Sequence, residues 1–192
     1  MTRPRLSVSP DDALLHGNAE SGVWDGRQFV RCSGHETPMI CGIDPGQQGA
    51  IAWLSGEGYL IEVRDLPVTK SDGLIPAVLA DWLRAPGRLP AHAFVERVAA
   101  RPGAGVSGMF KFGRGYGQIE GVLAAVGIAA TLVTPGKWKG TLRIPADKAA
   151  SRARAAQLWP GLASAFARVR DDGRAEAALI GLYGANSMRS VP

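Results

Sequence analysis

Short apolar runs alternate with glycine-containing turns from residue 39 onward. The runs 39–44, 49–54 and 59–66 predict three antiparallel strands joined as a meander. Residues 74–83 carry apolar side chains at helical spacing and predict a helix. A fourth apolar run, 91–96, follows that helix. Because a helix connects it to the meander, we expect the fourth strand to lie parallel to a meander strand.

The second half of the chain predicts more helix than strand. In order, we expect a loop over 98–110, a helix over about 109–126, a strand over 128–133, a basic turn or short helix over 134–140, a helix from about 145 to 158, a short helix around 162–168 and a last helix over about 173–186. Strands followed by helices in this way indicate an α/β chain.

Residues 1–37 differ from the rest of the chain, because they are polar and show no sustained hydrophobic period. This predicts a mobile N-terminal extension, with a short ordered piece around Val23 and Trp24. One domain is expected over 38–192, a length sufficient for a full core.

The helix predicted over 109–126 contains a ridge of glycines, Gly113, Gly117 and Gly121, at every fourth position. Each glycine costs about 1 kcal/mol of helix stability relative to alanine. Close approach of another backbone would offset that cost. The sequence leaves three candidates for that backbone, namely the domain's own core, a second subunit or a nucleic-acid strand.

Composition indicates a water-soluble domain with a basic surface. Hydrophobic residues make up 46% and charged residues 20% of the 192 positions, and the net charge is +5. Basic residues gather between positions 97 and 154, namely Arg97, Arg101, Lys111, Arg114, Lys137, Lys139, Arg143, Lys148, Arg152 and Arg154. A solvated helix face would explain such a run. Its coincidence with glycine-rich loops favours nucleic-acid binding instead.

Cys32 and Cys41 are too few for a disulfide framework, and with His35 they fit no zinc spacing well. No apolar run approaches the roughly 20 residues that span a membrane. The basic start of the chain is not followed by the apolar segment of a secretory signal. We therefore expect a cytoplasmic protein with no membrane partner.

Two of the predicted strands end on a carboxylate, Asp44 and Glu96. Asp44 precedes Pro45 and Gly46, so a turn-initiating role would also explain it. If the two strands are parallel neighbours, their carboxyl ends place both acids side by side. Ligand sites of open α/β sheets lie at such ends.

The last predicted helix carries two further acids, Asp172 and Glu176, four residues apart on one face. An acid at a helix start is an ordinary capping choice, which explains Asp171 or Asp172 without any function. Glu176 is less easily explained, because alanine and leucine surround it.

Four converging carboxylates repel one another, and bound divalent cations remove that repulsion. Oxygen ligands suit Mg²⁺ or Mn²⁺. Two such ions about 4 Å apart activate a water and stabilise the leaving oxygen of a phosphodiester. From the residues alone, the chain predicts metal-dependent phosphodiester hydrolysis.

Three segments, in this order, resemble the RuvC-like Holliday junction resolvases of the RNase H-like superfamily, namely Gly42–Gly46 with Gly49–Ala50, Phe94–Glu96 and Asp172–Ala177. The stretch Met109–Gly121 and the turn Pro135–Lys139 look like the branch found in phages and phage-derived bacterial regions. The resemblance covers roughly residues 39–186.

The resemblance implies an RNase H-like fold over 38–192, with a five-stranded mixed sheet of order 3-2-1-4-5 flanked by helices. It implies two Mg²⁺ or Mn²⁺ ions in each active site, held by Asp44, Glu96, Asp172 and Glu176. It also implies that Lys139 stabilises charge on the scissile phosphate. Many relatives carry two aspartates three apart on the last helix, whereas Asp172 and Glu176 are four apart, so Asp171 is an alternative to Asp172.

The family implies a homodimeric endodeoxyribonuclease that resolves Holliday junctions or other branched DNA in recombination and repair. The expected DNA contacts are Arg97, Arg101, Lys111, Arg114, Lys137 and Lys139. Met109 and Phe110 are candidates for a wedge at the branch point, and the glycine ridge is a candidate dimer contact.

Three other functions fit parts of the sequence. A sugar-kinase or actin-like ATPase also begins with Gly-Ile-Asp and a glycine turn, but it needs a second domain and a second phosphate loop. A nuclease of the same superfamily that cuts RNA–DNA hybrids or flaps is a closer alternative. A junction-binding member without catalysis is the third.

Overall fold

The computed structural model describes residues 22–24, 29–31, 38–46, 48–69, 71, 73–85, 87, 89–99 and 105–190. The chain divides into two units, Met1–Glu36 and Thr37–Pro192. In the first unit, β1 (Gly22–Trp24) and β2 (Phe29–Arg31) pair antiparallel. Apart from these strands, the extension predicted over 1–37 lies outside the described residues.

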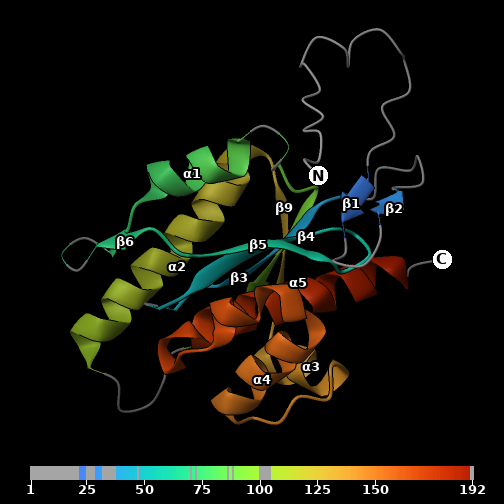
Figure 1. The fold of residues 1–192 in the computed structure, drawn as a ribbon. Helices are drawn as coiled ribbons and strands as arrows, with labels where there is room; N and C mark the ends of the chain where they lie inside the picture. Colours follow the sequence, from blue (N-terminus) through green and yellow to red (C-terminus); the bar gives the residue numbers. More distant parts are fainter. Residues whose placement is uncertain are drawn as a thin grey trace, which may run out of the picture. The chain divides into compact units, whose positions relative to one another are not determined.

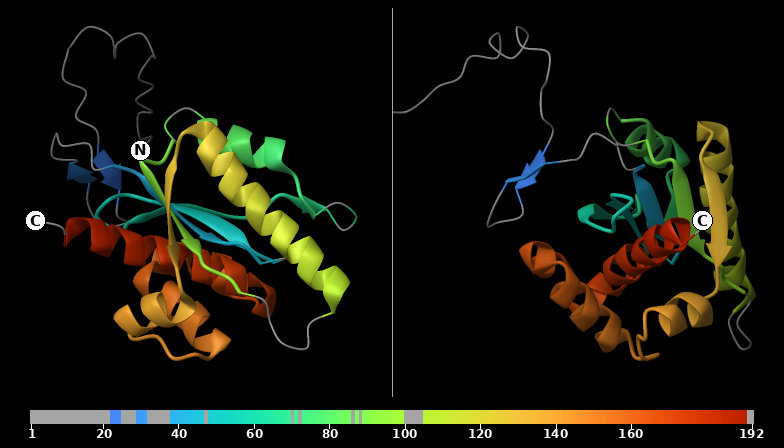
Figure 2. Two further views of the ribbon diagram at one scale, coloured as in Figure 1. Left: turned by 180° about the vertical axis from the view of Figure 1, so that it is seen from behind. Right: turned by 90° about the vertical axis from the view of Figure 1, so that its right-hand side faces the viewer.

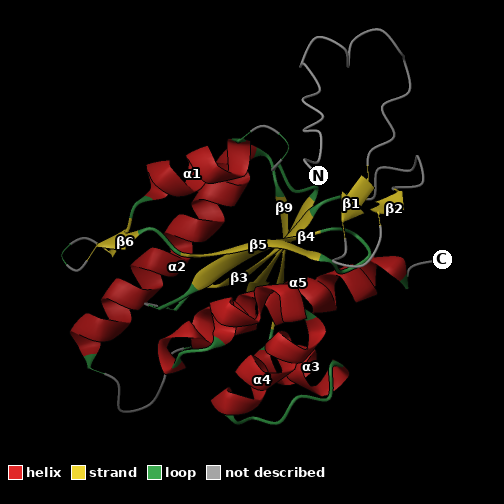
Figure 3. Ribbon diagram, viewed as in Figure 1, coloured by secondary structure: helices red, strands yellow, loops and turns green. Residues whose placement is uncertain are grey.

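A five-stranded mixed sheet forms the centre of the second unit (Figure 3). Its strands are β3 (Ile40–Asp44), β4 (Ala50–Leu54), β5 (Leu60–Asp65), β8 (His92–Glu96) and β9 (Ala129–Val133), in the spatial order β5-β4-β3-β8-β9. Strands β3, β4 and β5 pair antiparallel, whereas β3 with β8 and β8 with β9 pair parallel. The predicted order 3-2-1-4-5 is confirmed.

Five α-helices accompany the sheet in the described part of the chain: α1 (Pro76–Arg84), α2 (Val106–Val126), α3 (Pro135–Thr141), α4 (Lys148–Leu158) and α5 (Asp172–Arg189). Two 3-10 helices, Pro160–Phe166 and Val169–Asp171, connect α4 to α5. A small hairpin of β6 (Val68–Thr69) and β7 (Gly73–Leu74), which the sequence pattern did not predict, precedes α1.

Helix α2 begins at Val106, earlier than predicted, because the chain leaves its extended conformation at Gly105. Met109 and Phe110, where the predicted loop and the predicted helix overlap, therefore lie on the helix. The helix ends at Gly127, which has a φ of 84° and donates its N–H to the carbonyls of Leu123 and Ala124. This left-handed ending favours glycine.

The sheet separates two layers of helices, with α1 and α2 on one face and α5 on the other (Figure 1). The face toward α1 and α2 buries large side chains, including Ile43, Ile51 and Trp53. Figure 2 shows the same layers edge-on, with α4 beyond α5. The central strands β3, β4 and β8 are mostly buried between these layers, whereas most of β9 is exposed.

On the face toward α5, Gly42, Ala50 and Ala52 are small residues, so the helix lies close to the strands there. A Cβ at Gly42 of β3 would overlap the backbone of α5 at Ala177 and Gly181. Because Gly42 and Gly181 have no side chains, the backbones of β3 and α5 can approach each other closely. This contact fixes where the N-terminal end of α5 lies along β3.

Among the described helices, none has the length and apolar content needed to cross a membrane.

Candidate metal centre

Three carboxylates from distant parts of the chain meet at one edge of the sheet. Asp44 ends β3, Glu96 ends β8, and Glu176 lies in the second turn of α5. An oxygen from each carboxylate lies within 4.8 Å of the other two. The strands β3 and β8 are parallel neighbours and therefore end at the same edge. Close packing of α5 on Gly42 delivers Glu176 to that edge.

The turn after β3 orients Asp44. The backbone N–H of Gly46 donates to Asp44 Oδ1 at 3.0 Å, and Gly49 N–H donates to the carbonyl of Gly46 at 2.9 Å. A Cβ at Gly49 would overlap the carbonyl oxygen of Asp44. The glycine turn therefore lets the chain fold back tightly beside the carboxylate. Asp44 therefore has both expected roles: it accepts a hydrogen bond within the turn, and its carboxylate belongs to the cluster.

Helix α3 holds the other two carboxylates through consecutive residues. The indole Nε1 of Trp138, a fully buried side chain, donates to Glu96 Oε1 at 3.0 Å. Lys139 Nζ donates to Glu176 Oε1 at 2.8 Å, and the two side chains are 17% and 14% exposed. Each acid of the cluster thus has its own donor.

Sequence reasoning missed Trp138 as a functional residue. The signal available was an aromatic residue next to a lysine within a short basic segment. That signal does not show that the indole N–H points at Glu96, because the contact joins residues 42 positions apart.

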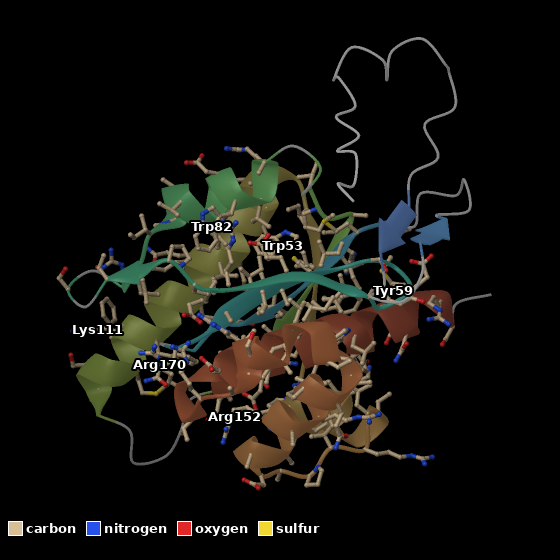
Figure 4. The ribbon with its side chains drawn as sticks, viewed as in Figure 1. Trp53, Tyr59, Trp82, Lys111, Arg152 and Arg170 are labelled. Carbon is tan, nitrogen blue, oxygen red and sulfur yellow. The ribbon has the colours of Figure 1, made fainter. Side chains whose placement is uncertain are left out.

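The structure does not bring Asp172 into the cluster. Its carboxylate accepts a bond from Arg152 Nε of α4 at 2.7 Å. Arg152, labelled in Figure 4, belongs to α4, which packs against α5. Asp171 also lies elsewhere: it is 1% exposed and accepts bonds from the backbone and guanidinium of Arg168. The hydrogen bonds from Arg168 lower the pKa of the Asp171 carboxyl.

Gly173 lies three residues before Glu176, in the first turn of α5. A Cβ there would overlap the carbonyl of Gln48 and lie 3.0 Å from Asp44 Oδ2. The carbonyl of Gln48 therefore occupies the space that a side chain at position 173 would need.

The predicted DNA contacts are placed as follows. Lys111 and Arg114 line a groove that also includes Pro45 and Gly46, next to the cluster. Arg97 and Lys137 are exposed. Arg101 lies outside the described residues. The wedge candidate Phe110 is 73% exposed, and Met109 is partly buried.

The donor set fits a hard divalent cation. Three carboxylates offer an oxygen each within 4.8 Å of one another, and Lys139 forms an ion pair with one of them, Glu176. Carboxylate oxygens are the ligands that Mg²⁺ and Mn²⁺ prefer. The arrangement can therefore hold a metal ion at the edge of the sheet.

The fold is similar to solved structures of RuvC. Thermus thermophilus RuvC is 20% identical and gives a TM-score of 0.57, with 78% of this chain and 96% of that chain covered. T. thermophilus RuvC in complex with Holliday junction substrate is 19% identical and gives a TM-score of 0.55, with coverage of 79% and 96%. No protein-family model and no curated protein matches the chain. The likeness confirms the RNase H-like fold that the sequence predicted.

Proposed function

We propose that the protein is a metal-dependent endonuclease that cuts four-way DNA junctions. The observation that carries the proposal is the convergence of Asp44, Glu96 and Glu176 at the carboxyl ends of two parallel strands. The similarity to RuvC, one structure of which contains a Holliday junction substrate, supports the choice of branched DNA.

Asp44, Glu96 and Glu176 would hold Mg²⁺ or Mn²⁺. Two ions per site, as the sequence resemblance implies, would supply an activated water and stabilise the leaving oxygen. Asp172, the fourth ligand expected from the sequence, is paired with Arg152. Ligation by Asp172 would require that ion pair to open, so the geometry favours the other three acids.

The residues of α3 serve the cluster in two ways. The indole N–H of Trp138 orients Glu96, and the ammonium of Lys139 donates to Glu176. A phosphate bound at the cluster would meet the Lys139 ammonium, which stabilises negative charge as it develops on the phosphate oxygens.

DNA would follow the basic residues around this edge. Lys111 and Arg114 line the neighbouring groove, and Arg97 and Lys137 are exposed on other elements. Arg101 completes the set predicted from the sequence. Phe110, exposed near the start of α2, would serve as the wedge at the branch point together with Met109. Unchanged junction cleavage by a Phe110→Ala, Met109→Ala variant would contradict the wedge role.

A homodimer would place two such sites on one junction, as paired cuts in opposed strands require. Gly113, Gly117 and Gly121 support α2 as the contact, because no described atom of the chain lies within 4 Å of a Cβ built at any of them. Among the described residues, the domain's own core therefore offers no segment that packs against the glycine ridge. A second copy is the partner we propose.

The test is incubation of the purified protein with labelled four-way junction, linear duplex and RNA–DNA hybrid, in Mg²⁺ or in EDTA. We expect symmetric nicks in the junction that require Mg²⁺ and disappear in Asp44→Asn. Preferential cleavage of the hybrid would indicate the alternative nuclease of this superfamily. Binding without cleavage under every metal would indicate a non-catalytic protein.

A further inference from the structure

A groove of about 510 Å³ lies between α2 and the β6–β7 hairpin, and the Pro45–Gly46 turn lies at its edge. The contact between α2 and β7 brings these elements together. Gly46 belongs both to the groove and to the cluster, since its N–H donates to Asp44. A molecule in the groove is therefore next to the proposed metal centre.

The lining of the groove has three chemical parts. Its floor is apolar and consists of Leu66, Leu74 and Ile119, which are 4%, 5% and 1% exposed. The side-chain amide of Gln118 adds hydrogen-bonding groups. Lys111 and Arg114 supply positive charge from exposed positions of α2. Figure 4 labels Lys111.

The described lining contains two cations and no aspartate or glutamate, although three carboxylates lie close by. Its charge thus complements an anion, and its floor complements a flat apolar group with polar edges. A nucleotide combines these properties, because its base is apolar on its faces and polar at its edge. The groove volume is within the range of about 300–1,000 Å³ typical of sites for one small ligand.

We propose that this groove takes one unstacked nucleotide of the cleaved DNA strand, adjacent to the phosphate at the carboxylate cluster. The proposal rests on the function proposed above and adds a base-recognition site to it. A base paired within a duplex cannot enter a groove of this size, so the nucleotide must leave the stack. Unstacking is easiest near a branch point, where pairing is already interrupted.

Within the groove, Lys111 and Arg114 contact the phosphate group of the unstacked nucleotide, and Gln118 contacts the edge of its base. A glutamine pairs best with adenine through two hydrogen bonds. Gln118 therefore determines sequence preference at that position, and Gln118→Ala should reduce the discrimination between bases about tenfold.

Gly115 offers a way to block the groove without disturbing the fold. It lines the groove on α2, and no described atom lies within 4 Å of a Cβ built there. The leucine side chain of Gly115→Leu would fill space in the groove without overlapping described atoms. Leucine is also a better helix former than glycine, so the helix should not be weakened. Gly161→Leu is a matched control, because Gly161 also faces open space among the described residues but lies outside the groove lining.

The experiment places 2-aminopurine at single positions flanking the cut in a four-way junction. The full-length protein is added in EDTA, and anisotropy confirms binding. We expect a several-fold fluorescence rise at one position, which reports an unstacked base. The rise should be lost in Gly115→Leu and kept in Gly161→Leu.

Two results would overturn the nucleotide site: no rise at any position while anisotropy reports full binding, or an undiminished rise in Gly115→Leu. Cleavage in Mg²⁺ separates this failure from failure of the proposed function. Junction cleavage without a fluorescence rise contradicts the groove alone. A rise without cleavage under any metal contradicts the nuclease and leaves the groove as a nucleotide site.

Discussion

Helices α2 and α5 both contain several glycines, but the two sets have different surroundings. On α5, a Cβ at Gly173, Gly181 or Gly184 would overlap atoms of the same chain, namely those of Gln48, Leu54 and Phe94. On α2, the ridge of Gly113, Gly117 and Gly121 has no described atom within 4 Å of a Cβ built on any of its members.

Contacts within the chain explain the glycines of α5, whereas the glycines of α2 need a partner outside it. The α5 glycines allow that helix to lie on the sheet and to deliver Glu176 to the cluster. The α2 glycines each cost about 1 kcal/mol of helix stability, and at these three positions no close approach of another described segment offsets that cost. A partner outside the chain would explain them.

The largest effect is expected on the α5 side, at Glu176. Glu176→Gln should lower the single-turnover rate of junction cleavage about a thousandfold or more, because the metal supplies several kcal/mol of charge stabilisation. Circular dichroism should show an unchanged fold. The matched variant is Asp172→Asn, for which we expect a loss of about tenfold or less, since the carboxylate pairs with Arg152. Equal losses in both variants would restore Asp172 as a ligand.

The next effect concerns the contact between α5 and β3. Gly42→Ala would place a methyl group against the α5 backbone at Ala177 and Gly181. The backbones of β3 and α5 cannot move apart without losing their packing, so the free energy of unfolding should fall by about 3 kcal/mol. Urea denaturation measures this change. An unfolding free energy equal to that of the unsubstituted protein would show that α5 does not lie on β3 as described.

The fold was largely predictable from the sequence because its strands are short apolar runs bounded by glycine turns. The sheet order, and with it the pairing of β3 with β8, came from the resemblance. The connecting helix predicted only that the fourth strand lies parallel to a strand of the meander. The β6–β7 hairpin was missed because strands of two residues leave no period to detect. The start of α2 was misplaced because Gly105 and Gly108 resemble loop residues.

The candidate site was predictable only where an acid broke an apolar pattern. Glu96 ends an apolar run and Glu176 interrupts one, so both stood out. Asp172 shares a helix face with Glu176 but is also explained as an ordinary helix-start acid, and its partner Arg152 belongs to another helix. Such a pairing depends on how α4 lies against α5, which local sequence does not specify. The Trp138 bond to Glu96 depends on tertiary position in the same way.

A smaller effect is expected at Trp138. Trp138→Phe keeps most of the buried ring but removes the N–H that orients Glu96. Partners of metal ligands contribute about 10- to 100-fold to metal affinity, so Mn²⁺ binding by titration calorimetry should weaken about tenfold. Trp159→Phe is the control, because it removes an indole bond to the carbonyl of Gly58, away from the cluster. Equal Mn²⁺ affinities in the two variants would contradict a positioning role for Trp138.

The smallest effect tests the α2 side and has the opposite sign to that of Gly42→Ala. In an exposed helix interior, Gly117→Ala should stabilise the monomer by about 1 kcal/mol. The added methyl group would at the same time obstruct close approach of a second α2 helix, and should weaken dimerisation measured by sedimentation equilibrium. Gly161→Ala, which also faces open space, controls for the substitution itself. If Gly117→Ala stabilises the chain and leaves its association unchanged, the ridge is not the dimer contact, and the glycines must accommodate a different partner such as the DNA backbone.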